Sequence, residues 1–576
     1  MSQHTIPAVT DLDDELDWDR TADVVVVGGG IAGLTTFVNA LDLGASAILV
    51  DKSSEPGGTS AKAGAGMMVP NNRFLRGLGR GESKEDFARF LARVGRPALY
   101  DPDHPTFGLA EWEKDLIDLF FETSAVGLER LEALGAIETM HIPDWPSYND
   151  LDEDGCRYGR VLFTVHEGEI GTGATALARM RATAERLGGT VLPGHRVAGV
   201  FRNREGAVVG VRTSTTSGEA AIRARKAVVF ATGGFVHNEE LAREHLGGFY
   251  PGGCAARTSE GDLVPIASAL GVPLFNMGTA WGAPVQLERA LARDPALIAN
   301  FNLAGDSIIE VNKYGVRLRN EKTTYNDRTQ AHFAWDPTRV EYPNWLVFPV
   351  WDHRCALQFC GEAGIDDGNV IPPSREPAAP SGARRRQPGI GTTVSPKGAV
   401  DAWKYVVSGT TLEELAAALD ARLASLGSGA RGVRLDGEFA ARLKQSIEQF
   451  NGYARAGRDP DFHRGETSIE AYFHGTPAAD NDLPNGLLYP LSDHGPYYAT
   501  ILAPGAIDTK GGPKVNRRLQ ILDAAGQPVP GLYGVGNCVA SASGGAYWSA
   551  GSTFGPYVGF GYAAAQSAVA EPNHSI

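Results

Sequence analysis

The chain has 576 residues, more than one hydrophobic core ordinarily organises, so we expect two or more domains. Its net charge of −15 excludes nucleic acid as a partner, because no basic stripe is present to displace counterions from a phosphate backbone. The sequence also lacks an apolar run of about 18 residues, a signal-peptide pattern and cysteines at metal-ligand spacing, so we expect a cytoplasmic protein with reduced thiols, no membrane span and no metal site.

The chain begins with the pattern of a compact β-α-β unit. Residues 23–27 are a continuous apolar run typical of a buried strand, and residues 34–43 have helical spacing. Residues 47–50 predict a second strand, which ends at Asp51. We expect the Asp51 carboxylate to accept hydrogen bonds from the ribose hydroxyls of an adenosine.

The turn between the first strand and the helix is the segment GGGIAG at residues 28–33, which fits the GxGxxG pattern of a dinucleotide site. Gly28 permits the tight turn, Gly30 lets a pyrophosphate approach the backbone, and Gly33 lets the helix pack closely on the strand. Together with Ile31 and Ala32 at the start of the helix, these residues form the predicted phosphate-binding turn.

Further glycine segments favour FAD over NAD, because an extended flavin cofactor needs contacts far from its adenine. One loop follows Asp51 directly, a second segment follows a predicted strand at 227–230, and a third lies in GLYGVGN at 531–537. The residues expected to contact the cofactor in these segments are Lys52, Gly58, Thr59, Ser60, Gly64, Ala65, Gly66, Ala231, Thr232, Gly233, Gly536 and Asn537. We also expect contacts from Val197, Asp262, Ser552, Thr553 and Gly555.

The remaining chain predicts an inserted domain between two nucleotide-binding segments. Residues 83–135 look largely helical, and strands are expected at 191–192, 197–201, 207–211 and 227–230. We expect an FAD-binding domain at 1–275 and 496–576 and a substrate domain at 276–495. Within the insert, residues 366–400 predict a flexible surface loop and residues 412–426 a helix. A last helix is expected near residues 558–569.

These motifs resemble those of the flavoprotein superfamily that contains fumarate reductase and the 3-ketosteroid dehydrogenases. The resemblance covers nearly the whole chain and rests on the GxGxxG turn, the GGTS…GAGM loop, the ATGG segment and GLYGVGN. It implies an α/β fold: a Rossmann-like FAD-binding domain of the fumarate reductase type with an inserted α+β substrate domain that holds the substrate against the flavin.

Within that superfamily the chain resembles the 3-ketosteroid Δ1-dehydrogenase branch. Asp508 in the DTKGG segment stands where the dicarboxylate-reducing branch has a histidine, and residues 542–551 lack the arginine of that branch. The segment GAYWSAGSTFGP at 545–556 instead resembles the active-site edge of the Δ1-dehydrogenases, and RNEKTTY at 319–325 resembles a segment that carries their second tyrosine.

The resemblance implies a catalytic set for removing two hydrogens beside a ring ketone. The Tyr547 hydroxyl and the Gly551 amide would donate hydrogen bonds to the ketone oxygen, as an oxyanion hole does. Tyr325 would take the α-proton, and the flavin the hydride. A third tyrosine assists the base in the family; Tyr148 is our candidate, although its surroundings depart from the family pattern and Tyr158 is an alternative.

The expected partner is therefore a cyclic ketone or steroid, with an unknown electron acceptor. A smaller cyclohexanone-type ketone is an alternative substrate. Two other functions stay open at this point: a flavin-dependent reductase of an activated alkene, which would need a proton-donating arginine that the sequence does not offer, and a non-catalytic flavoprotein. We expect Trp281, Trp345 and Trp351 to pack in the core.

Overall fold

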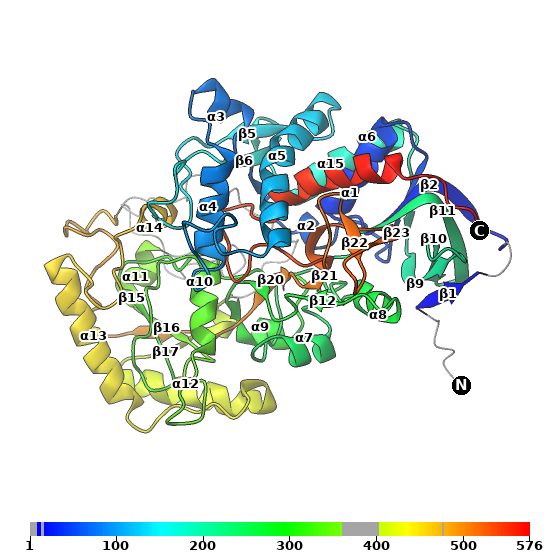
Figure 1. Ribbon diagram of the computed structural model, residues 1–576. Coiled ribbons are helices and arrows are strands. Elements are labelled where there is room, and N and C mark those ends of the chain that lie inside the picture. Colours follow the sequence, from blue (N-terminus) through cyan, green and yellow to red (C-terminus); the bar gives the residue numbers. More distant parts are fainter. Residues whose placement is uncertain (1–7, 13–15, 360–401, 475–476) are drawn as a thin grey trace. The chain divides into compact units, whose positions relative to one another are not determined.

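The computed structural model describes residues 8–12, 16–359, 402–474 and 477–576 (Figure 1). The loop expected at 366–400 therefore lies outside the described residues. The chain separates into two compact units: the first contains Met1–Leu246, Ala255–Trp281 and Asp508–Ile576, and the second Gly247–Cys254 and Gly282–Ile507. The domain boundaries expected after residues 275 and 495 stay a prediction, because the closeness of residues within a unit does not show which segments fold on their own.

A nine-stranded mixed sheet forms the centre of the first unit, and its connectivity is that of an α/β fold. Its strands are β1 Val9–Asp11, β2 Arg20–Val27, β3 Ala47–Asp51, β8 Thr190–Pro193, β9 Arg196–Arg202, β10 Val208–Thr215, β11 Gly218–Phe230, β22 Gln520–Leu522 and β23 Pro528–Gly534. The strands β11, β2, β3 and β8 are parallel neighbours in that order. The first half of β11 pairs with β10, and its second half pairs in parallel with β23.

Helices that pack on this sheet or on one another complete the main core of the first unit. They include α1 Ile31–Asp42, α4 Lys84–Gly95, α5 Glu111–Ala133, α6 Gly173–Arg186 and α15 Phe554–Ala570. Figure 1 shows α15, at the end of the chain, lying beside α1 from its start. Glycine permits this approach, because a Cβ added to Gly561 would lie 2.8 Å from the Ala32 carbonyl oxygen.

Short elements connect these parts of the first unit. They are α2 Gly58–Ala61, β4 Gly66–Met68, α3 Arg73–Gly77, β5 Thr139–His141, β6 Val161–His166, β7 Glu169–Ile170, α7 Glu239–His245, α8 Leu263–Ala269, β12 Leu274–Phe275, η5 Gly536–Cys538 and β21 Gly512–Pro513. The strands β4, β6 and β5 form a second, antiparallel sheet that β7 extends. The chain changes unit within β13 Ala280–Gly282 and β20 Ala506–Thr509.

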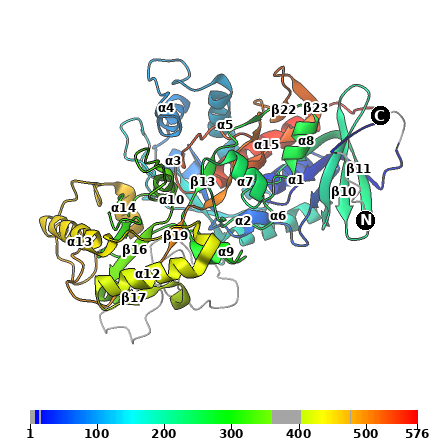
Figure 2. The ribbon, with the colours of Figure 1, turned by 90° about the horizontal axis from the view of Figure 1, so that it is seen from below.

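The second unit contains an antiparallel sheet of four strands. Its order is β15 Ile308–Val311, β16 Phe348–Asp352, β18 Tyr497–Ala499 and β17 Val407–Gly409. Two long helices, α12 Leu412–Leu426 and α13 Phe439–Ala456, pack on it through a shared apolar cluster (Figure 2). Shorter elements are β14 Val285–Gln286, α9 Leu287–Leu291, α10 Tyr325–Gln330, η1 Ala331–Phe333, α11 His353–Gln358, η3 Ala402–Tyr405, η4 Gly427–Ala430, α14 Ser468–His474 and β19 Leu502–Ala503.

A buried network of ion pairs lies in the second unit. Arg317 Nε donates to Glu321 Oε1 over 2.7 Å, and Arg464 Nη1 lies 3.1 Å from Glu321 Oε2. Asp459 accepts from Arg317, and Arg319 pairs with Glu310. Burial alone would raise the pKa of Glu321, but Arg317 and Arg464 outweigh it and lower that pKa to about 2.

Within the described ranges, none of the helices has both the length and the apolar character needed to cross a bilayer.

Candidate functional site

The glycine turn after β2 has the geometry that the sequence predicts. Gly28 has φ +109°, and a Cβ there would lie 2.4 Å from the Ala231 carbonyl oxygen. A Cβ on Gly33 would lie 1.9 Å from the Gly28 carbonyl oxygen, so a side chain would force α1 away from the strand. Gly30 is the N-cap of α1 and adds no side chain there, while the Ile31 amide in the first turn donates to Ser60 Oγ over 3.1 Å. The positive end of the helix dipole favours an anion at this position.

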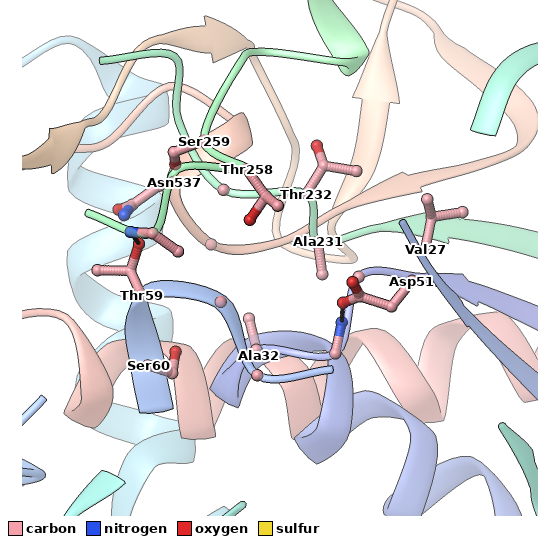
Figure 3. Close-up of a pocket in the computed structure, with 18 of the residues that line it drawn as sticks. Val27, Ala32, Asp51, Thr59, Ser60, Ala231, Thr232, Thr258, Ser259 and Asn537 are labelled. Atoms are coloured by element: carbon pink, nitrogen blue, oxygen red, sulfur yellow. Dashed lines mark hydrogen bonds between the residues drawn. The ribbon is translucent and has the colours of Figure 1, made fainter. Parts of the chain in front are cut away.

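Asp51 at the end of β3 faces this turn. Its Oδ2 accepts from the Gly29 amide over 2.7 Å (Figure 3). Its Oδ1 accepts from the Ser53 amide over 2.8 Å. Burial raises the pKa of Asp51 above its usual 3.8. Each carboxylate oxygen has a second lone pair, so the side chain can still accept from ribose hydroxyls.

A charged group of side chains lies beside Asp51. Lys52 Nζ lies 2.9 Å from both Glu260 Oε2 and Asp262 Oδ2, and Arg196 Nη2 lies 2.6 Å from Asp262 Oδ1. The expected cofactor residues Lys52 and Asp262 are therefore paired with each other. This pairing holds the segment around residue 260 against the end of β3.

One pocket in the first unit brings together most of the residues expected to bind a dinucleotide. In Figure 3 Asp51 and Asn537 lie at opposite sides of the view, with Ala32 and Ala231 between them. The expected residues that line it are Gly28, Gly30, Ile31, Ala32, Asp51, Lys52, Gly58, Thr59, Ser60, Val197, Ala231, Thr232, Gly233, Asp262, Gly536 and Asn537.

Several pocket residues were not expected from the sequence. They include Thr258, Ser259, Asp508 and Tyr557. The buried Asp508 carboxylate accepts from Ser259 Oγ over 2.6 Å and from the Gly234 amide over 3.0 Å. Burial raises the pKa of Asp508 above its usual 3.8. The DTKGG segment contains Asp508, but its pattern distinguishes branches of the superfamily and does not by itself indicate a pocket residue.

The other expected cofactor residues do not line this pocket in the described part of the chain. One of them lies in the glycine turn and the others lie near β4: Gly33, and Gly64, Ala65, Gly66, Ser552, Thr553 and Gly555. The Gly551 carbonyl accepts from the Met68 amide over 3.2 Å. A Cβ on Gly551, which has φ +80°, would lie 2.4 Å from the Gly66 carbonyl oxygen. The two glycine segments at 64–66 and 551–555 therefore lie directly against each other.

Tyr547 is buried among aromatic rings of the first unit. The Tyr148 ring stacks on it with centroids 5.8 Å apart, and the Trp281 ring meets it edge-on at 5.3 Å. Trp281 Nε1 in turn donates to Asn537 Oδ1 over 2.8 Å, and Asn537 also accepts from the Tyr557 hydroxyl. Trp281 and Asn537 thus connect Tyr547 with the dinucleotide pocket.

Tyr325 is the first residue of α10 in the second unit and is also buried. The Phe301 ring meets its ring edge-on at 5.0 Å, and its carbonyl accepts from Thr329 Oγ1 over 2.8 Å. Glu321, four residues earlier in the same sequence segment, belongs to the buried ion network. The segment that carries Tyr325 is therefore fixed at both ends.

Comparisons with known proteins agree with this architecture. The FAD-binding-domain family matches residues 23–554. The chain is 28% identical to the 4-oxocyclohexanecarboxylate 2-dehydrogenase of Sinomonas cyclohexanicum, over 95% of this chain and 92% of that protein. It is 27% identical to the 3-oxosteroid 1-dehydrogenase of Mycolicibacterium smegmatis, over 94% of this chain and 96% of that protein.

A solved structure shares the fold. The 3-ketosteroid delta1-dehydrogenase from Sterolibacterium denitrificans, in complex with 1,4-androstadiene-3,17-dione, matches with a TM-score of 0.76 and 22% identity. The match covers 96% of this chain and 100% of that one. At this identity the likeness concerns the fold alone.

Proposed function

This chain belongs to the FAD-binding-domain family, and we propose that within it the protein is an oxidoreductase that dehydrogenates a cyclic ketone beside its carbonyl. The observation that carries the proposal is the position of Tyr547, whose ring contacts the same Trp281 that donates to Asn537 of the dinucleotide pocket. A phenol fixed beside a flavin site is suited to hold a ketone oxygen. The two relatives named above act, by their names, on a monocyclic and a steroid ketone.

The residues present fit FAD. The glycine turn has no room for a Cβ at Gly28 or Gly33, Asp51 offers acceptors for the ribose, and the positive end of the α1 dipole favours the pyrophosphate. When bound, FAD supplies an acceptor for the hydride that leaves the β-carbon. The protein's own part is to bind, polarise and deprotonate the ketone.

We assign polarisation of the ketone to Tyr547 and Gly551. The phenol hydroxyl and the main-chain amide are both hydrogen-bond donors, and such donors stabilise the negative charge that develops on the ketone oxygen as the α-proton leaves. The positive φ of Gly551 and its contact with β4 fix the direction of its peptide group. Fixed donors are effective because they need not reorganise during the reaction.

Tyr325 is the proposed base for the α-proton. A phenol titrates near pH 10 in water, so the reaction requires surroundings that favour its ionised form. Tyr148, which stacks on Tyr547, is the proposed third tyrosine. The role of Tyr325 rests on its sequence segment and on the resemblance described above, and that of Tyr148 rests on its ring contact with Tyr547.

Anaerobic titration of the oxidised protein with ketones tests the function. We expect either a 3-ketosteroid or a cyclohexanone-type ketone to bleach the flavin absorbance, while the matching alcohols without a carbonyl leave it unchanged. The ring system that bleaches fastest identifies the substrate class. Should a broad panel of both classes leave the flavin oxidised, dehydrogenation of cyclic ketones is wrong.

The same preparation tests the opposite direction. A reductase of activated alkenes would be reoxidised rapidly when the chemically reduced protein meets fumarate or an enone. We expect no rapid reoxidation by fumarate, because residues 542–551 contain no arginine that could clamp a carboxylate and donate a proton.

A further inference from the structure

Lys510 is a fully buried lysine in the DTKGG segment. Its Nζ donates to Ser543 Oγ over 2.8 Å and to the Ala546 carbonyl oxygen over 2.9 Å. The same Nζ lies 3.8 Å from the centroid of the Trp281 ring. All of these partners are neutral, which is an uncommon environment for a lysine side chain.

The contacts of Lys510 reach Tyr547 along two separate routes. The first is the main chain, because Ala546 directly precedes Tyr547. The second is the aromatic contact, because the Trp281 ring that Lys510 covers meets the Tyr547 ring edge-on at 5.3 Å. A single amine therefore fixes both the backbone next to Tyr547 and one of the rings around it.

Tyr547 needs such a fixed point. It lies between η5, which ends at Cys538, and α15, which begins at Phe554, in a stretch without helix or strand. Backbone hydrogen bonds of regular structure therefore do not determine its position. The requirement is strict, since a displacement of about 1 Å can cost about a hundredfold in rate.

We propose that Lys510 is a positioning residue that holds the Tyr547 hydroxyl in place through Ala546 and Trp281, an inference that rests on the proposed role of Tyr547. Burial, together with the positive charge of Arg96, holds the pKa of Lys510 well below its usual 10.5. Keeping an amine in such surroundings is unfavourable, which is consistent with a role that an apolar side chain could not perform.

The test compares Lys510→Met with a matched control. Methionine keeps most of the apolar stem but removes the donors. Lys514→Met is the control, because Lys514 follows Lys510 by four residues and its Nζ lies over other rings, 3.7 Å from the Phe275 ring centroid and 5.3 Å from that of Trp112. We expect Lys510→Met to retain FAD and to lower kcat by about tenfold to a hundredfold, with KM changed far less.

Two further measurements separate positioning from general loss of structure. In protein labelled with 3-fluorotyrosine, the fluorine NMR resonance that disappears in Tyr547→Phe is assigned to Tyr547. We expect Lys510→Met to shift or broaden this resonance and Lys514→Met to leave it unchanged. In the Tyr547→Phe background, Lys510→Met should cause no additional loss of kcat, because residues that act as one unit are not additive.

The inference is overturned by an unchanged Tyr547 resonance, or by losses of kcat that multiply independently in the double variant. Should Lys510→Met not fold, Ser543→Ala removes one acceptor of Lys510 with a smaller change and is expected to disturb the same resonance. The resonance needs no substrate, so absence of ketone turnover in the unmodified protein would refute the proposed function while leaving this test intact.

Discussion

At the scale of single residues, the proposed chemistry depends on one phenol hydroxyl. Replacing Tyr547 with phenylalanine removes that donor and keeps the ring that packs on Trp281 and Tyr148. If the hydroxyl belongs to an oxyanion hole, kcat should fall by about 10²–10³, which corresponds to about 2.7–4 kcal/mol. Steady-state kinetics with the ketone identified by flavin titration measures this.

Tyr562→Phe is the control for that variant. Tyr562 lies in α15, and its hydroxyl accepts from Gln566 Nε2. Removing this hydroxyl should leave kcat and the FAD content unchanged. A Tyr547→Phe protein with unaltered kcat would remove Tyr547 from the mechanism.

Sequence patterns predicted some of these residues and not others. Gly28 and Gly33 were predictable because a turn without room for Cβ atoms leaves a fixed spacing in the sequence. Asp508 and Lys510 were not predicted as site residues, because their roles come from partners far away in the chain, such as Ser259 and Ala546. No local pattern records contacts over such separations.

At the scale of elements, the first β-α-β unit forms the cofactor turn, and Gly33 sets the distance between its helix and strand. We predict that Gly33→Ala abolishes tight FAD binding, because its Cβ would lie 1.9 Å from a backbone oxygen that cannot move away without displacing α1. FAD content after desalting and a fluorescence titration with added FAD measure this effect.

Gly77→Ala provides the comparison for that experiment. Gly77 ends α3 in the same unit, and an added Cβ would meet no atom within 4 Å. This variant should bind FAD as the unmodified protein does. Equal FAD affinity in the two variants would contradict the proposed function of the turn.

The elements themselves were predicted best where the apolar pattern was regular. The helix expected at 412–426 is α12 Leu412–Leu426, and the apolar strands at 23–27 and 47–50 lie within β2 and β3. The helical stretch expected at 83–135 divides into α4 and α5, and the intervening segment contains Pro97, Pro102 and Pro105, which disfavour helix. Strand β11 begins at Gly218, earlier than the expected 227. Its first half was not predicted, because charged residues there interrupt the continuous apolar run that marks residues 227–230.

At the scale of the whole molecule, stability in acid should depend on the buried ion network. The ionised form of Glu321 stabilises the fold, because its folded-state pKa is about 2 against a usual 4.5. Its contribution, on the order of 3 kcal/mol, is complete above pH 4.5 and is lost as the pH falls through about 2.

Glu321→Gln tests this contribution. The variant leaves Arg317 and Arg464 buried without their shared carboxylate, so we expect a loss of about 3–5 kcal/mol in unfolding free energy at neutral pH. The difference in unfolding free energy between the variant and the unmodified protein should become smaller at about pH 3. At that pH the unmodified protein has lost part of the stabilisation that ionised Glu321 provides. Urea unfolding at both pH values measures it.

Glu466→Gln is the surface control for that experiment. Its carboxylate pairs with exposed His463 and Arg458, so its loss should cost less than about 1 kcal/mol at either pH. A pH-independent difference between Glu321→Gln and the unmodified protein would show that Glu321 is not ionised in the folded state.

The first unit is assembled from three separated stretches of chain, and this has a consequence for its biosynthesis. Strand β23 at Pro528–Gly534 completes the sheet beside β11, and Asn537 closes one side of the cofactor pocket. A nascent chain on the ribosome therefore carries the glycine turn long before it carries the wall opposite. Cofactor capture must wait until nearly all of the polypeptide has emerged, so a prematurely terminated product would keep its nucleotide turn and still fail to retain FAD.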